Sequence, residues 1–277
     1  MRGEFIDVGG VRLYYYAAGM RGAGEPVVLI HGFPTSGHMW SDVAPLLTPG
    51  HRVIVLDLLG YGRSDPPAGK ALGVHAHADR VIALLDALSI GRACIVGHGF
   101  GGGVAQSLAV RTPDRVSRLC LVDSVAFDAW PSRTVRIWRR LHALVRIAPP
   151  SWIQSIVRAT LHRGYADAER GAHSLEQYVR VFGSSEGRST FVQHLWAFDS
   201  SETEAMGSRL GEIAAPAAIV WGRGDPFLPV SLGQRLRDAI PGATLDVVPS
   251  ACHFTPEDTP AAVSAVIGGL LGREVRA

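Results

Sequence analysis

The stretch ACIVGHGFGGGVAQSLAV, residues 93–110, reads as a buried strand, a very tight turn and a helix of small residues. In a large class of enzymes, the centre of such a turn carries a Ser, Asp or Cys that attacks the substrate. Here the centre is Gly99, which has no side chain. Without an oxygen or sulfur atom at this position, no acyl-enzyme or alkyl-enzyme ester can form there.

Other groups able to move protons follow other apolar runs. Asp123 ends LCLVD, Asp225 lies in GRGDPFLP, and His253 lies in SACHF. A carboxylate beside an imidazole holds its tautomer and stabilises its charged form. The three cysteines lack the spacing of a zinc site or a disulfide framework, and GFGGG does not match a dinucleotide-binding fingerprint. We therefore expect neither a metal nor a cofactor.

Apolar runs that alternate with helical patterns must position these groups. Strands are predicted at 4–8, 11–17, 26–32, 51–60, 92–99, 117–124, 217–225 and 244–250. Helices are predicted at 42–47, 74–88, 104–111, 232–240 and 260–271. The first two strands, joined by Gly9–Gly10, predict an antiparallel hairpin. The remaining alternation predicts an α/β fold with a mostly parallel sheet flanked by helices.

Residues 126–205 interrupt this alternation and contain no predicted strand. Helical patterns cover 132–147, 152–162, 174–182 and 188–198. The chain is therefore expected to form a core from 1–125 and 206–277, with an inserted all-helical cap at 126–205. The cap arginines could mark a membrane-facing amphipathic helix or a solvated helix face, and we expect the solvated face: Arg133, Arg136, Arg139, Arg140 and Arg146.

Composition limits the remaining classes of function. The 277 residues are 47% hydrophobic, with 27 basic and 25 acidic residues and a net charge of +2. This balance gives no field that favours nucleic acid. There is neither an apolar run long enough to span a membrane nor a signal-peptide core, so a cytoplasmic protein is expected. The chain is expected to be a monomer or a homodimer.

Several motifs in this order resemble the α/β-hydrolase fold, and the resemblance covers nearly the whole chain. They are HGFP at 31–34, DLLGYGRSDPP at 57–67, GHGFGG at 97–102, GRGDPFLP at 222–229 and SACHF at 250–254. The pattern is similar to epoxide hydrolases and haloalkane dehalogenases, which typically read Gly-His-Asp-x-Gly-Gly at the turn. Gly99 replaces that nucleophilic Asp, and Phe100 replaces the Trp with which many dehalogenases hold halide, which counts against dehalogenation.

The resemblance implies roles for the residues that remain. His253 holds the position of the catalytic histidine, and Asp225 that of its orienting acid. Asp123 is the second place where this fold puts that acid, and Asp225 is preferred. The backbone N–H groups of Phe33 and Phe100 would form an oxyanion hole, which does not depend on side-chain identity.

A substrate pocket is expected beside this machinery. His31 and His98 are candidates for it, although the turn pattern usually places the second of these side chains behind the turn. Aromatic residues are expected to line an apolar pocket for a hydrophobic or aromatic small molecule. They are Phe33, Trp40, Phe100, Trp130 and Phe227.

Three functions fit these residues. The preferred one is a non-covalent, non-hydrolytic enzyme, for example a lyase, cyclase or carbon–carbon bond-forming enzyme of natural-product tailoring that opens an epoxide. In it His253 acts as general base. The alternatives are a non-catalytic binder of hydrophobic ligands and a hydrolase of an epoxide or ester in which His253 activates water.

Overall fold

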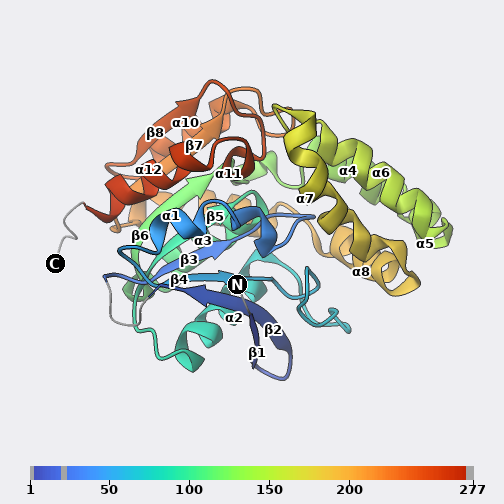
Figure 1. Cartoon of the computed structure of the whole chain (residues 1–277), viewed down its shortest axis with the longest axis horizontal. Coiled ribbons are helices and arrows are strands. Elements are labelled where there is room, and N and C mark those ends of the chain that lie inside the picture. The colour runs from blue at the N-terminus through green and yellow to red at the C-terminus, as the bar shows by residue number, and fades with distance from the viewer. Residues whose placement is uncertain (1–2, 20–23, 273–277) are drawn as a thin grey trace.

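The computed structural model describes residues 3–19 and 24–272 and has an eight-stranded sheet at its centre (Figure 1). The strand order is β1-β2-β4-β3-β5-β6-β7-β8. β1 (Glu4–Asp7) and β2 (Arg12–Ala18) form the predicted antiparallel hairpin, and β2 pairs antiparallel with β4. The other pairs are parallel: β3 (Val27–Ile30), β4 (Val53–Leu56), β5 (Ala93–His98), β6 (Val116–Val122), β7 (Ala217–Gly222) and β8 (Thr244–Val248). The predicted α/β class and mostly parallel sheet are confirmed.

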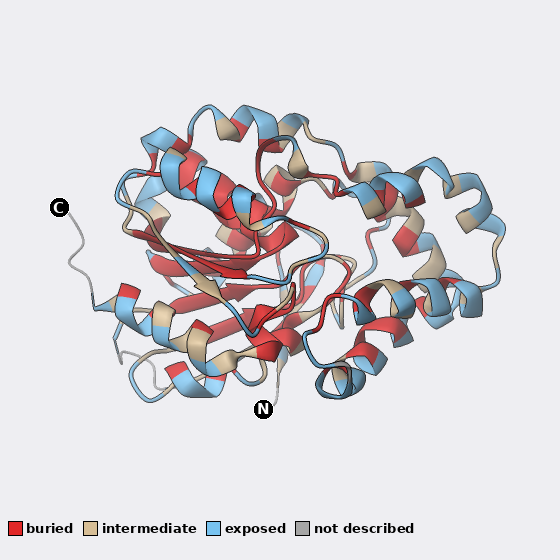
Figure 2. Cartoon of the chain, turned by 90° about the horizontal axis from the view of Figure 1, so that it is seen from above, coloured by how far each residue is buried: buried red, intermediate tan, exposed pale blue. Residues whose placement is uncertain are grey.

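The central strands are short, apolar and rich in β-branched residues. Every residue of β3, β4, β5, β6 and β7 is buried, and Figure 2 shows the sheet as the buried centre of the molecule. Continuous apolar runs of this kind are typical of parallel strands that are covered on both faces. The edge strand β8 is only half-buried along most of its length. The loops after these central strands are therefore held by a rigid base.

Helices cover both faces of this sheet. They are α1 (Ala44–Leu47), α2 (Val74–Ala87), α3 (Phe100–Arg111), α10 (Val230–Ala239) and α12 (Pro260–Leu271), with a short α11 (Thr255–Asp258) and the 3-10 turns η1 (Gly37–Trp40) and η2 (Pro113–Arg115). α3 begins at Phe100, before the predicted start at Val104. Gly101, Gly102 and Gly103, which were assigned to the turn, are part of α3. At Gly102 the helix backbone comes so close to Ser124 that a side chain would not fit. A Cβ on Gly102 would lie 2.0 Å from the hydroxyl oxygen of Ser124.

All described elements between β6 and β7 are helical. They are η3 (Phe127–Ala129), α4 (Arg133–Arg140), α5 (His142–Ile147), α6 (Pro150–His162), α7 (Ala168–Arg180), η4 (Val181–Gly183), α8 (Ser185–Ala197), α9 (Ser201–Gly207) and η5 (Leu210–Glu212). The predicted helix 132–147 is two helices that meet at Leu141. α7 begins before the predicted Ser174 because the Asp167 side chain caps its first amides. The division of the chain into core and cap remains a prediction.

None of the described helices is long and apolar enough to cross a bilayer. The helices α4 to α8 lie together at one end of the molecule, away from the strands β1 to β8 (Figure 1). This arrangement brings the side chains of α4 and α6 to the loops that follow the central strands.

A buried carboxyl group joins the helical segment to the sheet-bearing part. The hydroxyls of Tyr165, which follows α6, and Tyr178, in α7, donate hydrogen bonds of 2.6 and 2.9 Å to Glu257 in α11. Burial raises the pKa of the Glu257 carboxyl to about 7, against the partial compensation of these hydrogen bonds. The native chain therefore holds a proton on Glu257 between about pH 4.5 and 7, where the unfolded chain has lost it.

We expect the Glu257→Gln variant to flatten the dependence of stability on pH. An acid with a raised native pKa makes the free energy of unfolding fall as pH rises from about 4.5 to 7. The loss in the unmodified chain should reach at most about 3.5 kcal/mol, because the pKa differs by about 2.5 between the two states and a difference of one corresponds to about 1.4 kcal/mol. Urea unfolding at pH 5 and pH 8 measures this. The exposed Glu169→Gln control should follow the unmodified chain, and equal slopes for all three proteins would contradict the prediction.

Candidate active site

The tight turn predicted around Gly99 connects β5 to α3. Gly99 has φ +53° and ψ −121°, a conformation that L-residues adopt only with strain. Its N–H donates to the Val122 carbonyl at 3.1 Å, and its own carbonyl accepts from the amides of Gly102 and Val125 at 3.0 and 3.1 Å. These bonds fix the turn in place between two buried strands.

The glycines of this turn serve different purposes. A Cβ on Gly97 would lie 2.2 Å from the Gly101 carbonyl oxygen, and one on Gly101 would lie 2.4 Å from the His31 carbonyl oxygen. Both positions therefore need glycine for close approach of the backbone. A Cβ on Gly99 would meet nothing closer than Gly32 Cα at 3.6 Å and His253 Nε2 at 3.8 Å. Position 99 thus has room for a side chain, directed toward the imidazole.

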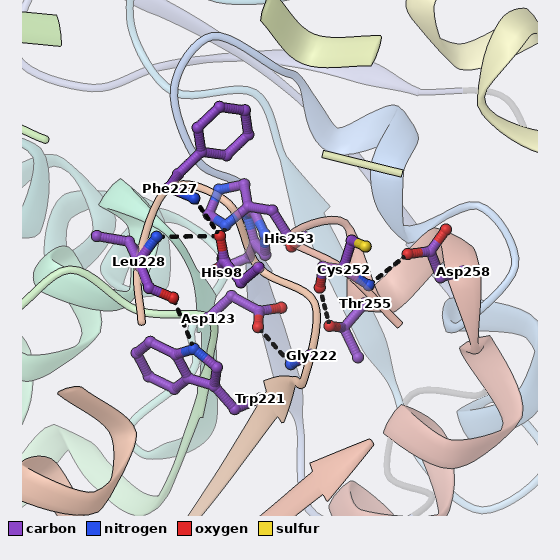
Figure 3. A network of polar contacts seen from close by, with 11 residues as sticks. His98, Asp123, Trp221, Gly222, Phe227, Leu228, Cys252, His253, Thr255 and Asp258 are labelled. Carbon is purple, nitrogen blue, oxygen red and sulfur yellow. Dashed lines mark hydrogen bonds and ion pairs between the residues drawn. The ribbon is translucent and has the colours of Figure 1, made fainter. Parts of the chain in front are cut away.

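His253 and Asp225 form a buried pair on the loops that follow β8 and β7. Figure 3 shows His253 together with Phe227 and Leu228. Nδ1 of the histidine lies 2.7 Å from Oδ2 of the aspartate, whose side chain is fully buried. The other oxygen, Oδ1, accepts from the amides of Phe227 and Leu228 at 2.8 and 3.0 Å. A carboxylate that accepts all three bonds places the imidazole proton on Nδ1. Nε2 is then left as an acceptor that faces position 99.

Asp123, the other acid considered for this role, is placed differently. It lies at the end of β6 with φ +43°, and Oδ1 accepts the Gly222 amide at 2.7 Å. No hydrogen bond joins it to His253 among the described residues. Burial, and then the neighbouring charge of Asp225, raise the pKa of Asp123 well above its usual value. The geometry therefore selects Asp225 as the partner of the histidine and leaves Asp123 as a buried group bonded to the backbone.

Two backbone amides lie near the turn on its other side. The HGFP loop carries Phe33, whose peptide bond to Pro34 is cis, and Thr35 donates its amide to Gly32 at 3.0 Å. A Cβ on Gly32 would lie 3.3 Å from the Phe100 nitrogen, so this loop and the start of α3 are in close proximity. Within residues 3–19 and 24–272, no acceptor bonds the amides of Phe33 or Phe100. Both donors are therefore available to a ligand.

A cavity of about 50 Å³ lies over this group and is largely apolar. Gly99 and His253 lie at its wall with four of the predicted aromatic residues: Phe33, Phe100, Trp130 and Phe227. The Phe227 ring meets the His253 ring edge-on at 5.1 Å between centroids. The volume holds only a few water molecules, so a larger ligand needs the wall to open.

Sequence reasoning missed the helical side of this wall. Its other members are Pro34, Val125, Ser132, Thr134, Val135, Trp138, Thr160, Leu161 and Leu228. Val135 and Trp138 are the buried face of α4, and Leu161 is on the buried face of α6. Helical periodicity in the sequence identifies such faces, but it does not tell which element each face meets.

Three predicted pocket residues do not line the cavity, and this corrects the prediction. Nε2 of His31 accepts the Leu58 amide at 3.0 Å, and burial lowers the pKa of His31 to about 4. Trp40 is fully buried in η1. Nε2–H of His98 donates to the His253 carbonyl at 2.8 Å, so this side chain lies behind the turn and supports the histidine loop. The side chains of His31, Trp40 and His98 are thus all buried in the core and do not reach the cavity.

Cavity size alone would misplace the site. A hollow of about 570 Å³ lies between β2, η1 and α7, but neither Gly99 nor His253 belongs to it. Its lining includes Tyr14, Asp57, Arg63 and Arg180. The smaller cavity is the better candidate because its wall holds the imidazole acceptor of His253 together with Phe33 and Phe100, whose backbone amides are free to donate.

Comparisons with known proteins agree with this geometry. The family model described as alpha/beta hydrolase fold matches residues 25–260. A 2-hydroxy-6-oxononadienedioate/2-hydroxy-6-oxononatrienedioate hydrolase of Paraburkholderia xenovorans (strain LB400) is 31% identical over 257 residues, which cover 89% of this chain and 86% of that protein.

Solved structures have the same architecture over almost the whole chain. An alpha/beta hydrolase fold protein from Burkholderia ambifaria has a TM-score of 0.87 at 29% identity and covers 96% of this chain and 99% of its own. The enol-lactonase from Burkholderia xenovorans LB400 has a TM-score of 0.82 at 25% identity, and the match covers 98% of this chain and 100% of that protein. None of these three proteins is named for epoxide or haloalkane chemistry. From the matched residues, the sheet and the turn, this chain belongs to the α/β hydrolase fold family.

Proposed function

We propose that this chain is a hydrolase that acts without a covalent enzyme intermediate on an apolar ester or lactone. The observation that carries the proposal is the His253–Asp225 pair. The free Nε2 of His253 lies 3.8 Å from the point where a Cβ on Gly99 would be. The names of the relatives support hydrolysis over the non-hydrolytic chemistry that was first expected. The family is enzymatic, which argues against a pure ligand binder.

In the proposed reaction, a water molecule occupies the space beside Gly99. Nε2 of His253 takes one of its protons while the oxygen bonds to the carbonyl carbon, and the carbonyl π electrons move to the oxygen. The amides of Phe33 and Phe100 bind the resulting oxyanion. When the intermediate collapses, the bond to the leaving oxygen breaks and that oxygen takes the proton back from the imidazolium. Asp225 stabilises the charged ring throughout.

The sizes of these effects define the substrate class. General-base catalysis contributes about 10²–10⁴-fold, and preorganised oxyanion donors contribute about 10²–10³-fold. Together they suit an activated ester or lactone and are insufficient for a stable amide. The aromatic wall around Phe33 and Trp130 favours an apolar acyl or alcohol group.

The wall also favours a second candidate. The cavity is small and lined by Phe33, Phe100, Trp130 and Trp138, so a bound substrate can exclude water from His253. The same imidazole would then remove a proton from the substrate itself, as in a lyase, a cyclase or a carbon–carbon bond-forming enzyme. No relative reported above supports this reaction, so it ranks second.

We expect His253→Ala to lower kcat for a chromogenic p-nitrophenyl ester by at least about 100-fold, because the general base is removed. Asp225→Asn should also lower kcat strongly, because the amide no longer favours the productive tautomer. His162→Ala, on the exposed face of α6, is the matched control and should retain full activity. Initial rates measure these effects, and an unchanged kcat in His253→Ala would contradict the assigned base.

We expect Gly99→Ser to gain the covalent chemistry that the unmodified chain lacks. The new Cβ fits 3.8 Å from Nε2, at a cost of about 1–3 kcal/mol for the strained backbone of a non-glycine residue. A fluorophosphonate should add to Ser at position 99 and leave the unmodified chain unlabelled, as intact-mass spectrometry will show. The Gly99→Ser, His253→Ala double variant is the control and should remain unlabelled. Labelling of the unmodified chain at the turn would refute a non-covalent site.

A further inference from the structure

The helices α4, α5 and α6 expose an unusual number of large apolar side chains. The described residues include ten exposed large hydrophobic side chains, and six of these fall between residues 137 and 156. We call these six the cap tip: Ile137, Leu141, Leu144, Ile147, Trp152 and Ile156. Ile147 is 76% exposed and Trp152 is 65% exposed. Concentrated apolar exposure of this kind marks an interaction surface.

Figure 1 places α5 at the end of the molecule opposite to α12 and β6. Figure 2 shows the same end as mainly exposed helix surface. The cap tip therefore projects from the body of the protein. A flat surface can approach it without meeting the sheet-bearing part first.

Positive charge is concentrated on the same helices. Residues 133–163 contain seven arginines and no Asp or Glu, whereas the rest of the chain has 20 basic and 25 acidic residues. Among the described residues, only Arg158 of these seven forms an ion pair, with Glu176. A hollow of about 350 Å³ is lined by Arg136, Arg139, Arg140, His142 and Trp196. Arg139 donates to the Phe198 carbonyl, whereas Arg136 and Arg140 are exposed and form no ion pair among the described residues. Exposed guanidinium groups beside such a hollow suit the phosphate of a lipid headgroup.

Two of these helices, α4 and α6, also contribute to the wall of the cavity at His253. On α4, Val135 and Trp138 face that cavity, whereas Ile137 and Arg140 are exposed. On α6, Leu161 faces the cavity and Trp152 is exposed. A contact at the cap tip therefore involves the exposed faces of helices whose buried faces line the place where an apolar substrate would bind.

We propose that the cap tip docks this protein on the surface of an anionic lipid bilayer. The apolar side chains enter the boundary between headgroups and acyl chains, the arginines bind lipid phosphates, and the helices lie on the membrane without spanning it. A second copy of this chain is a poorer partner, because it would set the same arginines against each other. The proposal takes up the membrane-facing alternative in place of the solvated helix face that the sequence favoured, and it is independent of the reaction at His253.

Co-sedimentation with lipid vesicles tests this surface in the full-length protein. The unmodified chain should bind vesicles of phosphatidylcholine with phosphatidylglycerol more strongly than vesicles of phosphatidylcholine alone, and added salt should weaken the difference. The Leu144→Glu, Ile147→Glu double variant should bind at least about tenfold more weakly. Leu46→Glu, at a 52% exposed leucine on α1, is the matched control and should bind like the unmodified chain.

A second pair of substitutions separates charge from apolar contact. Arg136→Ala with Arg140→Ala should lose the preference for anionic vesicles and keep the weaker binding to neutral ones. Circular dichroism on every variant verifies folding. Failure of the unmodified chain to bind anionic vesicles at low salt would overturn the proposal. Analytical ultracentrifugation that shows a dimer dispersed by the Leu144→Glu, Ile147→Glu variant would overturn it as well, and so would high-affinity capture of an acidic protein at the cap tip in place of lipid.

Discussion

The hydrogen bond between Asp225 and His253 is the interaction on which the site depends. The carboxylate is fully buried, and two loop amides hold it in position, so the imidazole has one tautomer and one orientation. Its Nε2 then points at a backbone turn whose geometry is fixed by hydrogen bonds to β6 and α3. The amides of Phe33 and Phe100, which have no acceptor among the described residues, belong to the cavity wall that also holds this pair's histidine.

The glycine at the centre of the turn has a specific chemical meaning because its neighbours are different. Gly97 and Gly101 are required by the close approach of strand, helix and loop, whereas position 99 has open space in front of it. The scaffold thus keeps a geometry suited to a nucleophile while the side chain is absent. A site of this kind can place water or a substrate atom where other members of the fold would place their own oxygen.

Much of the fold could be predicted because its signals are local. Strands such as VVLI and VIVL, which are buried on both faces, are continuous apolar runs, and their alternation with helices dictates a parallel sheet. The pairing of His253 with Asp225 followed from motif order. The break at Leu141, the internal role of His98 and the contribution of Trp138 did not, because these depend on which faces meet in three dimensions. Trp40 shows the same limit, since aromatic residues suit a core as well as a pocket.

The most direct test of the central claim is rapid-quench mass spectrometry of the unmodified chain during hydrolysis of a p-nitrophenyl ester in ¹⁸O-labelled water. If no covalent intermediate forms, the protein mass stays unchanged at every time point while the acid product gains one ¹⁸O atom. A transient increase of the protein mass by the acyl group would contradict it.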